Sequence, residues 1–200
     1  MTQHYYSENP NIAHDEKSVI YEVMDMEFTC VTDAGVFSRD GLDMGTRIML
    51  EALPELHGRV LDLGCGWGPV GLAVGKKYPE TKIVMTDINL RAVETAEKNL
   101  RANGVTNAET VQGDGYENVS GKFDFILLNP PIRTGKSAIY GMFSDAREYL
   151  AEKGELYIVI RKQQGAESAE KYLNTIFDDV ERVAREKGYW VIRCADPVVE

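Results

Sequence analysis

The chain has 200 residues, of which 44% are hydrophobic and 27% are charged, and its formal net charge is −10 at pH 7. This length and composition are typical of one globular domain and exclude fibrous and intrinsically disordered proteins. No apolar run approaches the roughly 20 residues that cross a bilayer, and the polar start of the chain lacks the basic and apolar regions of a signal peptide. We therefore expect a cytoplasmic protein that does not contact a membrane.

The negative net charge limits the kind of partner that the chain can bind. Proteins that grip naked nucleic acid through many phosphate contacts usually carry a basic face. A nucleic-acid substrate would therefore be recognised through a local basic patch, through its shape, or as part of a preassembled ribonucleoprotein. The cysteines include no C-x-x-C pair and the histidines form no ligand cluster, so we expect neither a disulfide framework nor a metal site.

Residues 1–40 are predicted to form an N-terminal extension. Residues 18–32 are rich in β-branched and aromatic types, which indicates two short strands outside the main sheet, joined by a turn at 24–26. A loop over 32–40 follows. The spacing of apolar residues then predicts a helix over 41–56.

From residue 59 onward, strand patterns alternate with helix patterns. The expected strands cover 60–63, 82–86, 107–112, 123–128, 155–160, 180–185 and 189–193, and the expected helices cover 70–77, 90–103, 137–150 and 166–177. Such alternation predicts an α/β fold in which helices cover both faces of a parallel sheet. The last two strands, joined by a short turn, suggest an antiparallel hairpin at one edge. We predict one such domain over residues 41–200.

The stretch Val60–Gly71 reads V-L-D-L-G-C-G-W-G-P-V-G. Gly64, Gly66 and Gly68 let the backbone turn sharply from a buried strand into a helix, which creates a pocket for a nucleotide-like ligand. A dinucleotide fingerprint would have its third glycine where Pro69 stands, so NAD is disfavoured. The stretch resembles motif I of the class I S-adenosylmethionine-dependent methyltransferases. A tight turn that binds no ligand is the alternative interpretation.

Three carboxylates lie near this turn or at the ends of the next strands. Asp87 ends a strand about 20 residues beyond the glycines, where a carboxylate can accept hydrogen bonds from both ribose hydroxyls of an adenosine cofactor. The resemblance implies that Asp114 accepts from the adenine amino group while the Gly115 backbone faces the ring. It also implies that Asp62 lies near the amino group of the cofactor, although a carboxylate there could equally bond backbone amides of the turn.

The tetrapeptide Asn129-Pro130-Pro131-Ile132 follows an apolar strand, at the sheet edge where ligand crevices form. Two prolines fix the backbone, so the side-chain oxygen of Asn129 and the carbonyl of Pro130 can point together into the pocket. Two convergent acceptors suit a planar NH2 group. The segment resembles the N-P-P-aromatic motif of methyltransferases that act on amino groups conjugated to a ring or a carbonyl. Ile132 departs from that motif, because it replaces the aromatic residue that stacks on the target.

A wider set of motifs resembles one family. The segments Y-Y-S-E-N-P, T-D-A-G-V-F-S, N-P-P-I-R-T-G-K and R-K-Q-Q-G-A, together with the glycine turn, are similar to the RsmC-like ribosomal RNA methyltransferases of the methyltransferase small domain family. The resemblance implies a Rossmann-like class I fold with a seven-stranded, mostly parallel sheet. It also implies transfer of a methyl group from S-adenosylmethionine to the exocyclic N2 of a guanine in small-subunit (16S) ribosomal RNA, without a metal.

The predicted site residues fall into three groups. The catalytic group is Asn129, Pro130, Pro131 and Ile132. The cofactor-binding group is Asp62, Gly64, Cys65, Gly66, Gly68, Asp87, Ile88, Asp114, Gly115 and Asn129. The substrate-binding group is Phe37, Arg133, Lys136, Arg161 and Lys162. The resemblance implies that the four cations of this group contact phosphates, and ordinary solvated charge is the competing interpretation for them.

Several other functions stay open on the sequence alone. An N6-adenine or glutamine amide methyltransferase would use the same asparagine, although those families usually keep the aromatic residue after N-P-P. The N-terminal residues Tyr5 and Tyr6, or Phe37, could supply the missing aromatic face. An NAD-dependent oxidoreductase would use the same type of sheet, and a ribosome-binding factor without catalytic activity could retain the same fold.

Overall fold

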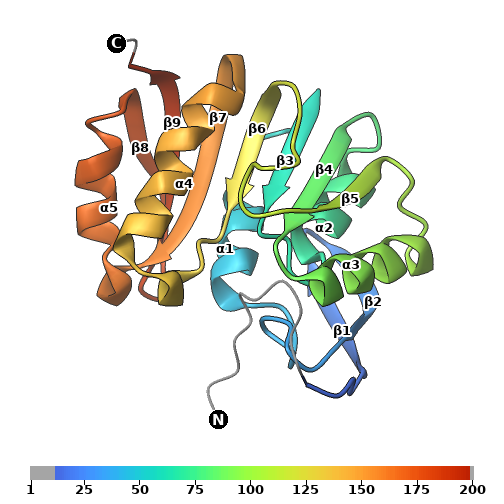
Figure 1. Ribbon diagram of the computed structural model, residues 1–200. Helices are drawn as coiled ribbons and strands as arrows, with labels where there is room; N and C mark the ends of the chain where they lie inside the picture. Colours follow the sequence, from blue (N-terminus) through green and yellow to red (C-terminus); the bar gives the residue numbers. More distant parts are fainter. Residues whose placement is uncertain (1–11, 199–200) are drawn as a thin grey trace.

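The computed structural model describes residues 12–198. Within this range, a two-stranded antiparallel sheet precedes a seven-stranded sheet of order β5-β4-β3-β6-β7-β9-β8, as Figure 1 shows. In the larger sheet, β9 runs antiparallel to its neighbours β7 and β8, and the strands from β5 to β7 pair in parallel. This topology confirms the predicted fold class, including the antiparallel hairpin at the C-terminal edge and the small hairpin outside the main sheet.

The boundaries of the elements are as follows. The strands are β1 (Lys17–Val23), β2 (Met26–Thr32), β3 (Arg59–Leu63), β4 (Lys82–Asp87), β5 (Ala108–Gln112), β6 (Phe123–Leu128), β7 (Leu150–Arg161), β8 (Phe177–Glu186) and β9 (Tyr189–Pro197). The α-helices are α1 (Met44–Ala52), α2 (Pro69–Lys77), α3 (Leu90–Ala102), α4 (Lys136–Tyr149) and α5 (Ala166–Leu173). Short 3-10 helices are η1 (Ile132–Thr134) and η2 (Lys162–Gln164). Among these described segments, no helix is long and apolar enough to cross a membrane.

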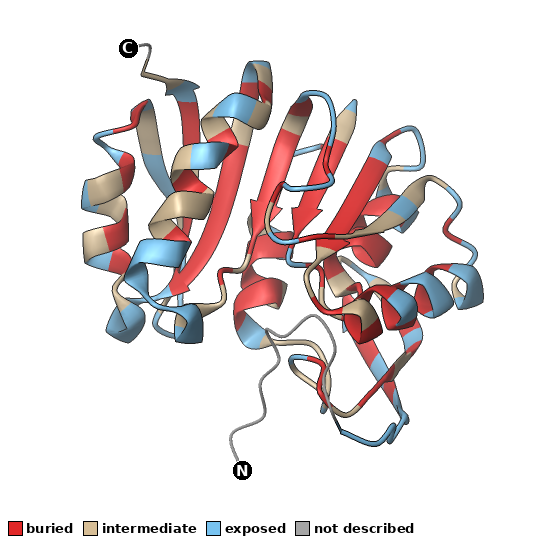
Figure 2. Ribbon diagram, viewed as in Figure 1, coloured by how far each residue is buried: buried red, intermediate tan, exposed pale blue. Residues whose placement is uncertain are grey.

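Helices cover the two faces of the sheet because successive strand residues point to opposite sides. In β3, Val60 belongs to the apolar cluster that includes α1, α2 and α3, whereas Leu61 belongs to the cluster that includes α4 and α5. Figure 2 shows the resulting pattern, in which the central strands are buried and exposed residues lie on the outer sides of the helices, in loops and in the β1–β2 hairpin. Parallel strands buried on both faces read as continuous apolar runs, as F-I-L-L in β6 does.

The β1–β2 hairpin packs beside α3, near the end of the sheet where the parallel strands stop (Figure 1). The Asn99 side chain accepts a hydrogen bond from Val31 N and donates to Val31 O, both at 2.8 Å, and it also donates to Trp67 O at 2.9 Å. Tyr21 of the hairpin meets the Trp67 ring edge-on, with centroids 5.4 Å apart. These contacts attach the hairpin directly to the glycine turn.

Two helices are shorter than predicted, each for a local reason. The helix predicted over 41–56 begins at Met44, because Asp43 caps it by accepting from Thr46 N, and it ends at Ala52. Leu53 precedes Pro54, and a residue before proline disfavours the helical conformation. The helix predicted over 166–177 ends at Leu173, and β8 begins at Phe177, which is buried in the sheet.

Candidate functional site

A cavity of about 310 Å³ opens at the edge of the sheet where the parallel strands end. Its walls come from the turns that follow β3, β4, β5 and β6, and from the loop before α1. The volume lies at the lower end of the range of roughly 300–1,000 Å³ that is typical of small-molecule sites. The predicted site residues that line it are Phe37, Asp62, Gly64, Cys65, Gly66, Asp87, Ile88, Asp114, Gly115, Asn129, Pro130, Pro131, Ile132 and Arg133.

Four predicted residues lie outside this lining, and their roles stay predictions. A side chain at Gly68 would meet Met85 and Ala96, so this glycine serves close packing of the turn. Lys136 and Lys162 are exposed near the start of α4 and in η2. The Arg161 guanidinium lies over the ring of Tyr189, 5.2 Å from its centroid. The predicted alternatives Tyr5 and Tyr6 lie outside the described residues.

The glycine turn is held against β4 by backbone hydrogen bonds. Gly64 N and Cys65 N both donate to Thr86 O, at 2.8 and 2.9 Å, and Gly66 N donates to Asp87 Oδ2 at 2.9 Å. Gly64 and Gly66 have φ angles of 75° and 56°, and a Cβ on either would meet nothing within 4 Å. The left-handed backbone, rather than crowding, therefore favours glycine at these two positions.

Asp87 braces the turn and does not cap the next helix. Its Oδ1 accepts from Asn89 N at 2.9 Å, and Asn89 itself caps α3 through a hydrogen bond from Arg91 N at 3.0 Å. Burial raises the pKa of Asp87, although hydrogen bonds from Asn89 N and Gly66 N oppose the rise. The carboxylate lines the cavity with its orientation fixed, as a ribose-binding group requires.

Asp62 is 3% exposed and accepts a hydrogen bond from Gly71 N at 3.0 Å. Burial, partly opposed by this hydrogen bond and reinforced by the charge of Asp87, raises the pKa of Asp62 to about 7. The structural alternative for Asp62, a bond to a backbone amide near the turn, is therefore present. Since Asp62 also lines the cavity, it can face a ligand at the same time.

Further polar groups at the ends of β4 and β5 line the cavity. Asp114 is exposed in the turn after β5, beside Gly115, which has a φ of 55°. Thr86 lines the cavity, and its buried Oγ1 has no hydrogen-bond partner among the described residues. A hydroxyl buried in this way can be satisfied by a polar ligand atom. Thr86 is not among the predicted site residues, although its position beside Asp87 at the end of a strand indicates that it could line the cavity.

Asn129 is oriented by residues that the sequence did not reveal. Its Nδ2 donates to Asp43 Oδ2 and to Thr46 Oγ1, each at 3.0 Å. Among the described residues, none donates to Asn129 Oδ1, so this oxygen remains for a ligand in the cavity. Asp43 and Thr46 also line the cavity. The pattern of an aspartate three positions before a threonine indicates a helix cap, but nothing in it points to Asn129.

Aromatic side chains line the cavity at other positions than the one after N-P-P. Ile132 lies in η1 and gives an aliphatic wall, whereas Phe37 and Tyr189 also line the cavity. Phe37 is 44% exposed, which is high for a side chain of this size. Tyr189, at the start of β9, was not predicted, and its sequence context gave no signal.

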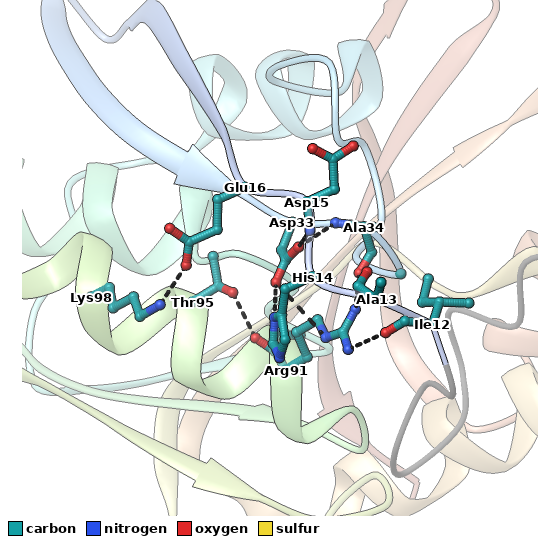
Figure 3. Close-up of polar contacts among 12 residues, drawn as sticks. Ile12, Ala13, His14, Asp15, Glu16, Asp33, Ala34, Arg91, Thr95 and Lys98 are labelled. Carbon is teal, nitrogen blue, oxygen red and sulfur yellow. Dashed lines mark hydrogen bonds and ion pairs between the residues drawn. The ribbon is translucent and has the colours of Figure 1, made fainter.

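The loop that carries Phe37 is fixed to α3 by a buried arginine, shown in Figure 3. Arg91 donates to the carbonyls of Ile12 and Ala34, both at 2.7 Å, and its Nε lies 3.8 Å from Asp33 Oδ2. The Asp33 side chain is 2% exposed. This network attaches the start of the described chain and the loop to the helix that follows Asp87. Between residues 12 and 198, no three His, Cys, Asp or Glu side chains gather to hold a metal ion.

Comparisons with known proteins identify relatives of this chain. A family model described as methyltransferase small domain matches residues 27–193. The chain is 41% identical to "Uncharacterized protein YbxB" of Bacillus subtilis (strain 168), over 96% of this chain and 98% of that protein. It is 34% identical to "Ribosomal RNA small subunit methyltransferase C" of Pseudoalteromonas translucida, over 90% of this chain. The chain spans 53% of the length of that relative.

A solved structure shares the fold. The T. thermophilus 16S rRNA N2 G1207 methyltransferase (RsmC), in complex with AdoMet and guanosine, aligns with a TM-score of 0.83 at 24% identity, over 94% of this chain and 52% of that one. The family match favours methyl transfer over the predicted alternative of an oxidoreductase. The chain belongs to the methyltransferase small domain family, with ribosomal RNA small subunit methyltransferase C among its relatives.

Proposed function

We propose that this protein transfers a methyl group from S-adenosylmethionine to the exocyclic N2 amino group of a guanine in small-subunit ribosomal RNA. One observation carries the proposal. Asn129 Nδ2 is engaged by Asp43 and Thr46, which leaves the side-chain oxygen of Asn129 for a ligand, and both Asn129 and Pro130 line the cavity. An amino group with two N–H bonds is the chemical partner of two such acceptors.

The residues that would hold the cofactor are those of the glycine turn and the strand ends. Asp87 would accept hydrogen bonds from the ribose hydroxyls, and Asp114 would accept from the adenine amino group. Asp62 would face the cationic amino group of the methionine portion, and Thr86 Oγ1 offers a further polar contact. The bound cofactor supplies a methyl group on a positively charged sulfur, which is a good leaving group.

Asn129 and Pro130 would carry the chemistry of the acceptor. The lone pair of a guanine amino group is delocalised into the ring, which makes the nitrogen a poor nucleophile. Hydrogen bonds from both N–H groups to Asn129 Oδ1 and the Pro130 carbonyl would favour the pyramidal nitrogen, whose lone pair would then be available to form the N–C bond as the S–C bond of the cofactor breaks. The methylated amine would be a strongly acidic cation, so it would release one proton to solvent water. Positioning and electrostatics can therefore provide the catalysis.

The choice of ribosomal RNA is supported by relatives. Both the P. translucida relative and the T. thermophilus structure are named as small-subunit ribosomal RNA methyltransferases, and the latter contains guanosine. Ile132 supports this choice over N6-adenine or glutamine amide methylation, since those families usually carry an aromatic residue there. Arg133, which lines the cavity, is the predicted phosphate contact nearest to the N-P-P segment.

The test is transfer of labelled methyl groups from S-adenosylmethionine to purified 30S subunits, 50S subunits, naked ribosomal RNA, DNA and protein in parallel. Digestion to nucleosides then identifies the product. We expect label in N2-methylguanosine from 30S subunits or their RNA. Label in N6-methyladenosine, in methylglutamine or in 50S RNA would show that the substrate differs from the one proposed. If none of the tested substrates received label, the proposed activity would be excluded.

A further inference from the structure

The side chain of Asn129 contacts a residue that lies 86 positions earlier in the chain. Asp43 Oδ2 accepts from Asn129 Nδ2 at 3.0 Å and from Thr46 N at 3.0 Å, so a single oxygen atom receives both hydrogen bonds. Thr46 Oγ1 is a second partner of Asn129 Nδ2, also at 3.0 Å. Both N–H groups of the asparagine amide are therefore directed toward the N-terminus of α1.

This arrangement allows only one orientation of the asparagine amide. An ionised carboxylate accepts hydrogen bonds and has no proton to donate. If the amide rotated by half a turn, Asn129 Oδ1 would face Asp43 Oδ2, and two acceptors would lie within contact distance. The hydrogen bond from Thr46 N fixes Asp43 Oδ2 as an acceptor independently of its charge, since a backbone amide can only donate.

We propose that Asp43 is a positioning and specificity-determining residue, which directs Asn129 Oδ1 into the cavity and so restricts the substrate to a nitrogen that donates hydrogen bonds. The inference rests on the proposed function, because it assigns the role of Asn129 in that reaction to a second residue. A carbonyl or a ring nitrogen without hydrogen, presented at the same place, would meet an acceptor and be rejected.

A packing contact supports the same assignment. A Cβ on Gly45 would lie 3.0 Å from Asp43 Oδ2 and 2.8 Å from a ring carbon of Tyr189. The first turn of α1 therefore packs closely between the aspartate and the aromatic wall of the cavity. Asp43 is held by this packing and by its own capping bond, which lets it hold Asn129 in turn.

Three substitutions separate positioning from helix capping. Asp43→Asn keeps an oxygen that accepts from Thr46 N and from Asn129, so we expect kcat within about threefold of the wild type. Asp43→Ser keeps a good helix cap, but its shorter side chain does not reach Asn129. For this variant we expect kcat to fall at least tenfold, while the KM for RNA and the Kd for S-adenosylmethionine change by less than about threefold. Thr46→Val removes the other acceptor, and we expect a smaller loss of kcat.

A measurement that needs no substrate accompanies these kinetics. In ¹H–¹⁵N spectra, the Asn129 side-chain NH2 signals can be assigned because they are absent from the spectrum of Asn129→Ala. We expect Asp43→Asn to preserve their slow exchange with water and Asp43→Ser to abolish it. Unchanged exchange in Asp43→Ser, or unchanged kcat in a folded Asp43→Ser protein, would overturn the inference. If the wild type methylates no guanine, the proposed function fails, but the NH2 signals still decide whether Asp43 orients Asn129.

Discussion

At the residue scale, two neighbouring carboxylates have different surroundings and different expected tasks. Asp87 accepts from two backbone amides, which leaves its oxygens oriented at the cavity wall. Asp62 accepts from Gly71 N alone among the described hydrogen bonds and is more deeply buried. We therefore expect Asp87 to bind a neutral hydroxyl pair and Asp62 to respond to a cation.

Removal of the Asp87 carboxylate tests the first task. We expect Asp87→Ala to weaken binding of S-adenosylmethionine by about 1.5 to 3 kcal/mol, the size of hydrogen bonds to a charged group. Isothermal titration calorimetry gives the affinity directly. Because Asp87 also accepts from Gly66 N, a thermal unfolding curve of the free variant separates loss of the ligand contact from loss of the turn. Unchanged affinity would contradict the assignment.

The raised pKa of Asp62 makes a pH dependence testable. Burial raises this pKa to about 7, so much of Asp62 is protonated in the free protein at neutral pH. A cation beside it stabilises the carboxylate and lowers its pKa in the complex, so affinity rises as the pH rises through about 7. We expect Kd to fall about tenfold between about pH 6 and about pH 8, and Asp62→Asn to lose this difference. Parallel pH curves for the two proteins would refute the role.

At the element scale, the strand ends could be predicted and the contacts between distant elements could not. Asp87 and Asn129 follow apolar runs, and the glycine spacing shows which strand precedes the pocket, so sequence reasoning places them in the lining. Asp43 and Tyr189 reach the same cavity through the packing of α1 and β9, which no local pattern encodes. The apolar spacing alone extends α1 to residue 56, whereas Leu53-Pro54 indicates the earlier end that the structure shows, because a residue before proline disfavours the helical conformation.

The start of α3 holds the Phe37 loop, and this connection has a measurable stability. Arg91→Ala removes the hydrogen bonds to two carbonyls and the ion pair with Asp33, which keeps His14 Nδ1 and two backbone amides as partners. Because two hydrogen bonds from a charged group are lost, we expect the free energy of unfolding to fall by about 3 kcal/mol, measured by urea denaturation. Arg101→Ala is a matched control on the same helix, since its pair with Glu97 is exposed, and we expect a change below about 0.5 kcal/mol. Equal decreases in the free energy of unfolding of the two variants would show that the buried network around Arg91 does not stabilise the protein.

At the scale of the whole molecule, the net charge of −10 limits how the protein would bind the RNA substrate that we propose. Four predicted phosphate contacts, Arg133, Lys136, Arg161 and Lys162, lie in or near the segments after β6 and β7. Each phosphate contact contributes about 0.7 to 0.9 to the slope of log affinity against log salt concentration. We expect a slope of about −3 for 16S RNA, reduced by about 1 in Arg133→Gln, measured by filter binding across salt concentrations. A slope near zero would show that these four side chains do not contact phosphates.

In the proposed reaction, the Asn129 side-chain oxygen and the Pro130 carbonyl together hold the amine that receives the methyl group. The most direct measurement is single-turnover methyl transfer to 30S subunits by Asn129→Ala, with the affinity for S-adenosylmethionine determined on the same preparation. We expect the affinity to stay within a few fold of the wild type while methyl transfer is lost. Methyl transfer at the wild-type rate in this variant would show that Asn129 does not hold the amine.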